Sequence, residues 1–273
     1  MRKAVNSTIL TSSILLFALA AWAGLNAAFI ASGNWSPATC ISQGCFCENV
    51  HPQWPVQPVN SWSSLAFLIP AVVVLYDRRI PTSACFYSSG ASFRTLFGVS
   101  LVTIALGSAF YHATLSLVGQ TLDVLGMYLL ISLAVLSCLA DQIQAVKNKF
   151  LPVYLSVNVL LVVLLVIWPE VRREIFAGLV ISLLFVEIWR MRSPSNHLPA
   201  RWFWIGLLTL AAAYTIWILD NLRILCDPGS ILQGHAAWHF LGAAAAWFLY
   251  RYYRSDLSAA SLETTQPALP GIS

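Results

Sequence analysis

Long apolar stretches alternate with short polar segments along most of the chain. A helix needs about 17 to 25 mainly apolar residues to cross a bilayer. Eight stretches approach this length: Ile9 to Ile30, Ser61 to Tyr76, Phe93 to Tyr111, Thr121 to Ala140, Leu151 to Trp168, Ile175 to Trp189, Trp202 to Leu222 and Leu232 to Tyr250. They lack the alternation of a membrane β-barrel and are too long for barrel strands. The pattern predicts an all-α, polytopic membrane bundle.

Composition supports this fold class. The chain has 273 residues, of which 58% are hydrophobic and 10% are charged, and its mean hydropathy is +0.73. One soluble core cannot enclose that much apolar surface, so the surplus must face lipid. The net charge of +4 does not indicate a nucleic-acid partner, because the basic residues lie in scattered pairs between the apolar stretches.

The basic residues predict the orientation of the bundle. If the N-terminus is cytoplasmic and each stretch crosses once, only Arg172, Arg173 and Arg223 of the 15 lysines and arginines lie outside, which leaves 12 inside. This asymmetry satisfies the positive-inside rule. We therefore expect both termini in the cytoplasm.

The first apolar stretch has two interpretations. Arg2 and Lys3, followed by an apolar run with Ala21-Trp22-Ala23, are typical of a signal peptide with a small-residue cleavage site. We favour a retained anchor, because the run continues to Ile30 and exceeds the usual length of a signal core. In either case the segment that follows is exported.

The chain divides into four segments on this pattern. Residues 1–31 form the anchor or signal helix, 32–60 an exoplasmic cap rich in Cys, Pro and Trp, 61–254 the transmembrane core, and 255–273 a cytoplasmic tail. We expect the tail to be disordered, because its Ser, Thr, Pro and Ala residues form no periodic apolar face.

Four of the six cysteines fall on the exoplasmic side, where disulfides persist: Cys40, Cys45, Cys47 and Cys226. The Cys-x-Cys pair in the cap is open to two interpretations, as a soft metal-ligand pair or as partners in disulfides. The oxidising location favours disulfides.

A small set of polar residues lies inside the predicted helices, although each ionisable side chain there costs about 2.5 to 3.5 kcal/mol on insertion scales. Ser108 and His112 share one helix face at spacing i, i+4, and His235 and His239 repeat that spacing on the last helix. Asp123 follows His112 across a short turn. The topology therefore brings all five to one depth near the outer surface.

This set suits zinc-dependent hydrolysis. Three neutral imidazoles hold Zn²⁺ with a fourth position open for water. His235 and His239 would supply two ligands from one helix and His112 the third. Asp123 would then act as general base and Ser108 would hydrogen-bond the water or the developing oxyanion. The alternative is that the histidines only hydrogen-bond across helices and stabilise the bundle.

Three further charged residues have simpler interpretations. Glu187 lies near the cytoplasmic end of its helix beside Arg190, so we expect a solvated or snorkelling ion pair. Asp220 and Arg223 are spaced i, i+3 at an outer end and are expected to pair with each other. They also lie close enough to the proposed site to support its metal ligands.

Three motifs together resemble the alkaline ceramidase family, which is related to the adiponectin and progestin receptors. They are Gly107-Ser108-Ala109-Phe110-Tyr111-His112 followed by Leu122-Asp123, Gly234-His235-Ala236-Ala237-Trp238-His239, and Leu219-Asp220-Asn221 with Cys226-Asp227. The resemblance extends in order and spacing from about Cys47 to Tyr253.

The resemblance implies a seven-helix core preceded here by one extra N-terminal helix. It implies that His112, His235 and His239 bind zinc, that Ser108 and Asp123 handle the water, and that the substrate is the amide of ceramide, cleaved to a sphingoid base and a fatty acid. It also supports a disulfide between Cys47 and Cys226. The rival functions are a receptor-like lipid-binding protein and a hydrolase of another lipid amide or ester. The residues do not indicate an oligomeric state.

The family's calcium site survives only in part in this chain. Glu48 and Asn49 match two of its ligands, whereas Cys45 and Phe46 replace Asp-Trp, and Gln57 stands where the family has a later Glu. Fewer carboxylates weaken calcium binding, so the resemblance predicts at most a weak calcium site at Glu48 and Asn49.

Overall fold

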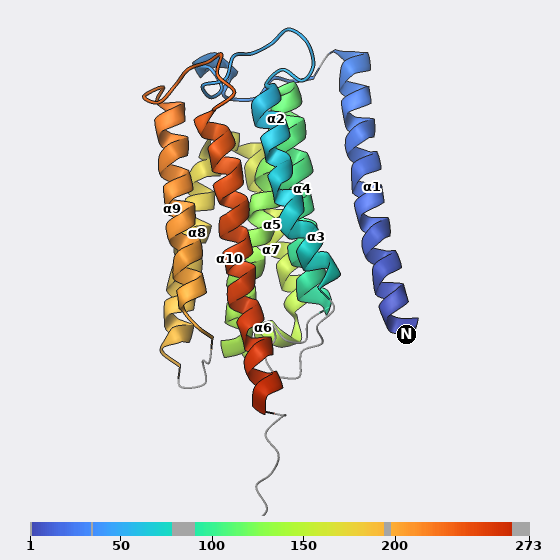
Figure 1. The fold of residues 1–273 in the computed structure, drawn as a ribbon, viewed down its shortest axis with the longest axis vertical. Coiled ribbons are helices and arrows are strands. Elements are labelled where there is room, and N and C mark those ends of the chain that lie inside the picture. The colour runs from blue at the N-terminus through green and yellow to red at the C-terminus, as the bar shows by residue number, and fades with distance from the viewer. Residues whose placement is uncertain (1, 34, 78–90, 194–197, 264–273) are drawn as a thin grey trace, which may run out of the picture.

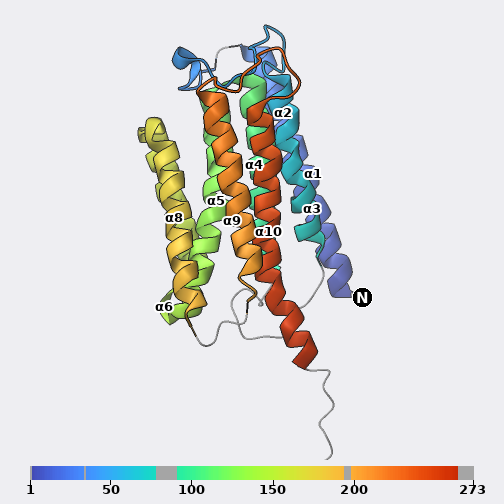
Figure 2. The same cartoon turned by 60° about the vertical axis from the view of Figure 1, so that its left-hand side comes forward.

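The protein is a bundle of roughly parallel helices with a loop-rich cap at one end (Figures 1 and 2). The computed structural model describes residues 2–33, 35–77, 91–193 and 198–263. Within these ranges there is no β-strand, only an isolated bridge between Pro37 and Ser116. The predicted all-α fold is therefore confirmed.

Every predicted apolar stretch coincides with helix. The α-helices are α1 (Arg2–Ser32), α2 (Pro58–Ser64), α3 (Leu68–Tyr76), α4 (Ala91–Thr114), α5 (Leu117–Gln142), α6 (Gln144–Asn148), α7 (Phe150–Ile167), α8 (Arg172–Met191), α9 (Arg201–Asn221) and α10 (Gly234–Glu263). Short 3₁₀ turns are η1 (Ile41–Gln43), η2 (Leu65–Phe67) and η4 (Pro169–Val171). The stretch from Ser61 to Tyr76 comprises most of α2 followed by η2 and α3.

Six helical spans in the described part of the chain are long and apolar enough to cross a membrane. They are α1, the continuous span Pro58–Tyr76, α4, α5, α7 and α9. Helices α8 and α10 run alongside these spans in the same bundle (Figure 2). The chain is thus a multi-pass membrane protein.

The hairpin of α4 and α5 lies at the centre of the bundle and sets the geometry of the candidate site. Ser116 caps α5 by accepting a hydrogen bond from the N–H of Gly119 at 3.1 Å. At Gly107 the two helices approach so closely that an added Cβ would lie 2.7 Å from the backbone carbonyl of Leu122. A side chain larger than hydrogen would therefore push α4 and α5 apart.

Residues 35–57 cover the ends of α4, α9 and α10 and form what we call the cap. Backbone hydrogen bonds attach it to the α4–α5 turn, from the N–H of Ala38 to the carbonyl of Leu115 and from the N–H of Leu117 to the carbonyl of Ser36. Two disulfides hold it, Cys40–Cys45 within the cap and Cys47–Cys226 to the α9–α10 loop. The second is the disulfide that the family resemblance implies.

Helix α1 stands to one side of the bundle, and its first residues lie at the same end as the end of α10 (Figure 1). Trp54 of the cap donates a hydrogen bond to the Asn26 side chain on α1 at 3.1 Å. Helix α10 continues to Glu263, beyond Arg254 where the tail was expected to begin. The sequence allows this extension, since no Pro or Gly occurs between Ser255 and Glu263.

The expectation that Glu187 and Arg190 are solvated is wrong. Their ion pair forms at 2.7 Å, but Glu187 is fully buried and Arg190 is 5% exposed. The hydroxyls of Tyr252 and Tyr253 on α10 donate to the Glu187 carboxylate at 2.9 and 3.0 Å. Because these two tyrosines reach from α10 to the pair on α8, the pair lies inside the bundle rather than at its surface.

Candidate active site

Three buried histidines meet just beneath the cap. His112 comes from the last turn of α4, and His235 and His239 come from the first two turns of α10. Their potential ligand atoms all lie within 4.8 Å of one another, and each side chain is at most 4% exposed. The structure therefore brings together the histidines that the sequence analysis paired across the bundle.

Outer hydrogen bonds orient two of the three imidazoles. The Nδ1 atom of His112 lies 3.0 Å from the Gln57 side-chain oxygen, which can only accept. The Nδ1 atom of His239 lies 2.8 Å from the hydroxyl of Ser63, whose proton is donated to the carbonyl of Asn60. Both Nδ1 atoms therefore carry the ring proton, and both Nε2 atoms present lone pairs.

These lone pairs fit a metal ion. The Nε2 atoms of His112 and His235 are 3.0 Å apart, and two Zn–N bonds of about 2.0 to 2.1 Å in a tetrahedron place nitrogens about 3.3 Å apart. The Nδ1 atom of His235 is buried and has no hydrogen-bond partner among the described residues. Three neutral imidazoles direct nitrogen atoms toward one point, and hydrogen bonds at Nδ1 hold two of the rings in place. Zinc prefers such a set of donors.

Ser108 and Asp123 border the same centre. The hydroxyl of Ser108 lies 3.4 Å from Nε2 of His239 and accepts a hydrogen bond from Ser64 at 3.1 Å. The Asp123 carboxylate lies close enough to interact with the same hydroxyl. A carboxylate and a hydroxyl thus stand beside the three imidazole nitrogens, where an activated water would need a base and a hydrogen-bond partner.

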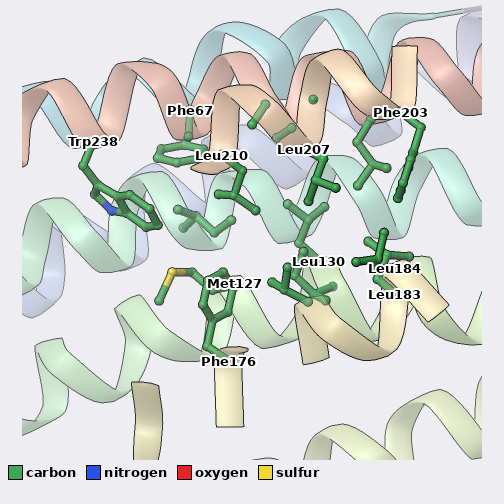
Figure 3. A pocket seen from close by; sticks show the side chains of 18 residues that line it. Phe67, Met127, Leu130, Phe176, Leu183, Leu184, Phe203, Leu207, Leu210 and Trp238 are labelled. Carbon is green, nitrogen blue, oxygen red and sulfur yellow. The ribbon is translucent and has the colours of Figure 1, made fainter. Parts of the chain in front are cut away.

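One cavity reaches the centre, and a second cavity adjoins the first. The first, here called the polar cavity, is lined by Phe46, Tyr111, Gln120, Asp123, Val124, Met127, Arg172, Arg173, Phe176, Tyr214, Trp217, His235, Trp238 and His239. The second, the apolar cavity, lies deeper between α4, α5, α8, α9 and α10 and has only apolar side chains on its walls (Figure 3). Both are lined by Met127, Phe176 and Trp238, so the cavities meet at these residues.

The expected pair between Asp220 and Arg223 does not form. Both carboxylate oxygens of Asp220 accept backbone N–H groups, from Cys47 and from His235, each at 3.1 Å. Arg223 donates instead to the carbonyl of Phe46 at 3.1 Å. Asp220 thus fixes the start of α10 where His235 lies, while Arg223 holds the cap and touches none of the histidines.

The residues in the region of the expected calcium site do not fit a calcium ion. The carboxylate of Glu48 accepts N–H groups of Val59 and Asn60 at 2.7 and 2.9 Å, so it caps α2. Burial raises the pKa of Glu48. Asn49 is exposed, and the amide of Gln57 directs hydrogen-bond donors toward the cap carbonyls. Calcium requires six to eight oxygen ligands, and this arrangement offers too few.

Several residues at the site were missed by the sequence analysis. Gln57, which immediately precedes α2, contacts His112. On α2, Ser63 contacts His239 and Ser64 contacts Ser108. The ring of Phe46 packs 3.9 Å, centroid to centroid, from that of His235. A signal existed for the serines, since polar residues cluster at the start of an otherwise apolar span.

Comparison with known proteins identifies the family. Residues 41–267 match the family described as Ceramidase, which is most of the chain. The chain belongs to the ceramidase family. Two proteins of Dictyostelium discoideum that carry the name "Putative alkaline ceramidase" are similar to it. The one designated dcd3B is 28% identical over 178 residues, and dcd3A is 26% identical over 168 residues.

The matches to these relatives are partial. They cover 57% and 52% of this ceramidase-family chain, and 61% and 57% of the relatives. The chain therefore spans about three fifths of the length of the curated relatives it matches. Membership of the family agrees with the resemblance drawn from the sequence motifs.

Proposed function

We propose that this protein is a zinc-dependent amidohydrolase that cleaves the amide of ceramide, or of a similar lipid, within the membrane. The observation that carries the proposal is the convergence of three buried histidine nitrogens with Ser108 and Asp123 beside a polar cavity that adjoins an apolar one. Family membership and the similarity to proteins named as alkaline ceramidases support the choice of substrate.

His112, His235 and His239 would hold the zinc ion through their Nε2 atoms. Zinc held by three imidazoles lowers the pKa of a water molecule toward about 7 and polarises a carbonyl oxygen. Gln57 and Ser63 keep the ring protons of two ligands on Nδ1, and thereby keep Nε2 free to bind. The fully buried position of His112 excludes bulk water from this side of the centre.

Asp123 and Ser108 would carry the proton and the developing charge. Asp123 accepts the proton of the attacking water and then gives it to the departing amine of the sphingoid base. Before the reaction the Ser108 hydroxyl would donate to the Asp123 carboxylate. Once that carboxylate has taken the proton of the water, the same hydroxyl would donate to the oxygen on which negative charge develops. The amide C–N bond breaks, and the products are a fatty acid and a free amine.

The two cavities suit a lipid whose polar amide lies near the cap and whose chain enters the bundle. The walls of the apolar cavity are side chains such as Leu130, Leu183 and Leu207 (Figure 3). Each methylene of a chain gains about 0.8 kcal/mol when it leaves water. An acyl chain in this cavity would place the amide near Met127 and Trp238, where the two cavities meet.

The decisive experiment is hydrolysis of a lipid panel by the purified protein before and after zinc chelation. The panel contains a fluorescent ceramide, an N-acyl amino lipid and an ester lipid. We expect release of fatty acid from ceramide, loss on chelation and recovery on addition of zinc. Zinc analysis of His239→Ala should show loss of the bound metal, since one of three ligands is gone.

His51→Ala is the matched control, because His51 is an exposed histidine of the cap with no part in the centre. It should retain one zinc ion per chain and full activity. Binding of ceramide without turnover would favour a receptor-like protein. Preferential cleavage of the ester would assign another lipid substrate, and unchanged zinc content in His239→Ala would refute the metal site.

A further inference from the structure

Gln57 is a buried side chain that joins the cap directly to the histidine centre. It is fully buried and immediately precedes α2. Its Nε2 atom donates to the carbonyls of Cys45 at 3.0 Å and Glu48 at 3.1 Å, while its Oε1 atom accepts from Nδ1 of His112. Both N–H groups of the amide are satisfied, so the direction of each hydrogen bond is determined.

The groups that Gln57 connects are themselves held in place. Cys45 is tied to Cys40 by a disulfide, and Glu48 follows Cys47, which is bonded to Cys226. The backbone N–H of Gln57 also donates to the carbonyl of His112 at 3.1 Å. The imidazole of His112 is therefore linked through one side chain to the part of the cap fixed by disulfides.

We propose that the amide of Gln57 joins the cap to the site in place of a bound cation with a carboxylate ligand, and that Gln57 positions His112. Two carbonyl oxygens converge on the amide nitrogen, as they would on a calcium ion. Among the described residues, two carboxylates lie near this point, and backbone N–H groups already occupy both: Val59 and Asn60 donate to Glu48, and Cys47 and His235 donate to Asp220. The cap is therefore held to the site without calcium.

This proposal makes two separable claims. That the cap needs no cation depends on the hydrogen bonds alone. That Gln57 positions a ligand rests on the proposed metal site, because it concerns the zinc affinity of His112. Partners of a metal-ligating histidine commonly change metal affinity 10- to 100-fold when they are removed.

The test compares Gln57→Glu with the wild-type protein. A carboxylate at this position cannot donate to the carbonyls of Cys45 and Glu48, but it adds oxygen ligands beside them and recreates a cation site. Thermal unfolding of the purified full chain in detergent is measured with EGTA and with 1 mM CaCl₂. We expect the wild-type Tm to be the same in both. The variant should have a lower Tm in EGTA and gain about 5 to 10 °C with calcium.

Gln120→Glu is the matched control. Gln120 is also a buried glutamine that holds the cap, and its side-chain oxygen accepts the backbone N–H and hydroxyl of Thr39, each at 3.0 Å. A carboxylate there keeps both hydrogen bonds, and among the described residues no carbonyl accepts from the Gln120 amide nitrogen. We expect no response of its Tm to calcium.

A second variant, Gln57→Leu, separates positioning from stability. It should lower the Tm with no recovery in calcium, and lower zinc affinity by 10- to 100-fold, whereas His51→Ala in the exposed part of the cap should leave zinc affinity unchanged. A wild-type Tm that rises with calcium would overturn the proposal, and this measurement requires no variant. So would a Gln57→Glu protein that ignores calcium, or unchanged zinc affinity in Gln57→Leu. If the wild type binds no zinc, the proposed function fails while the calcium result still stands.

Discussion

At the scale of single residues, the site depends on which ring nitrogen carries each proton. In His112 and His239, acceptors behind the ring hold the proton on Nδ1 and leave Nε2 directed at the shared centre. A neutral imidazole in this tautomer is ready to bind a metal without losing a proton first. The residues therefore divide into two groups. The three histidines present the converging nitrogen atoms, and Asp123 lines the cavity beside them.

This division predicts that a change at Asp123 reduces the rate of hydrolysis without reducing the zinc content. Asp123→Asn keeps the size of the side chain and a hydrogen bond to Ser108, but the amide cannot accept a proton from water. We expect the rate of ceramide hydrolysis to fall by about 10² to 10⁴-fold, while zinc content and Tm change little. Hydrolysis and metal analysis of the same purified sample provide the measurement. Activity within tenfold of the wild type would show that Asp123 is not the base.

The sequence could predict the five residues at the centre because helix periodicity and topology suffice to place them. Ser108 and His112 lie one turn apart on α4, and His235 and His239 repeat this on α10. The partners behind them could not be predicted in the same way. Gln57 reaches His112 only because the cap folds back over α4, and such a contact leaves no period in the sequence.

At the scale of elements, the close approach of α4 and α5 sets the distance between Ser108 and Asp123. A Cβ at Gly107 would lie 2.7 Å from the carbonyl carbon and oxygen of Leu122, and 3.0 Å from the backbone nitrogen of Asp123. These are backbone atoms, so they cannot move away without moving α5. Small residues at helix contacts in membranes allow this kind of approach.

Gly107→Ala should therefore damage both stability and activity. Overpacking of this kind costs about 1 to 3 kcal/mol, which corresponds to a Tm lower by roughly 2 to 12 °C. Hydrolysis should fall in parallel as Ser108 moves from Asp123. Gly178→Ala on α8 is the control, since an added Cβ there meets no atom within 4 Å. It should keep or raise the Tm, because alanine favours helix by about 1 kcal/mol. Equal effects of the two changes would contradict the role of this contact.

The observed helices agree with the predicted stretches where lipid requires apolar residues. They differ from the prediction where contacts within the protein determine the structure. The stretches that became α4, α5 and α7 were recognisable by their length and composition. The pattern of apolar residues marks neither the change to a 3₁₀ turn at η2, within an unbroken apolar stretch, nor the continuation of α10 past Arg254. The ion pair of Glu187 with Arg190 was predicted from spacing, but its burial results from α10 lying over it.

At the scale of the whole molecule, most of the basic residues are predicted to lie on the side opposite the site, whereas Arg172, Arg173 and Arg223 lie at the site or its cap. The cap, its disulfides and the histidines occupy one end, whereas the start of α1 and the end of α10 lie at the other (Figure 1). Arg78 and Arg79, which contribute to the predicted asymmetry, fall outside the described residues. Disulfides persist in oxidising compartments and lysines and arginines concentrate on the cytoplasmic side. Both arguments, which are independent, predict that the active site faces the exoplasmic surface.

Cysteine labelling in intact cells tests this orientation. Leu232→Cys introduces a thiol in the α9–α10 loop at a side chain that is 85% exposed, and Asn148→Cys introduces one at the exposed end of α6. An impermeant maleimide should label the first in intact cells and the second only after permeabilisation. The wild-type protein is the control for background labelling: Cys138 is buried, and the predicted topology places Cys85 on the cytoplasmic side or in the membrane, so any label that the wild type takes up after permeabilisation is subtracted. The reverse pattern would place the cap in the cytoplasm, where the disulfides would not persist, and the proposed substrate would have to reach the site from the inner leaflet.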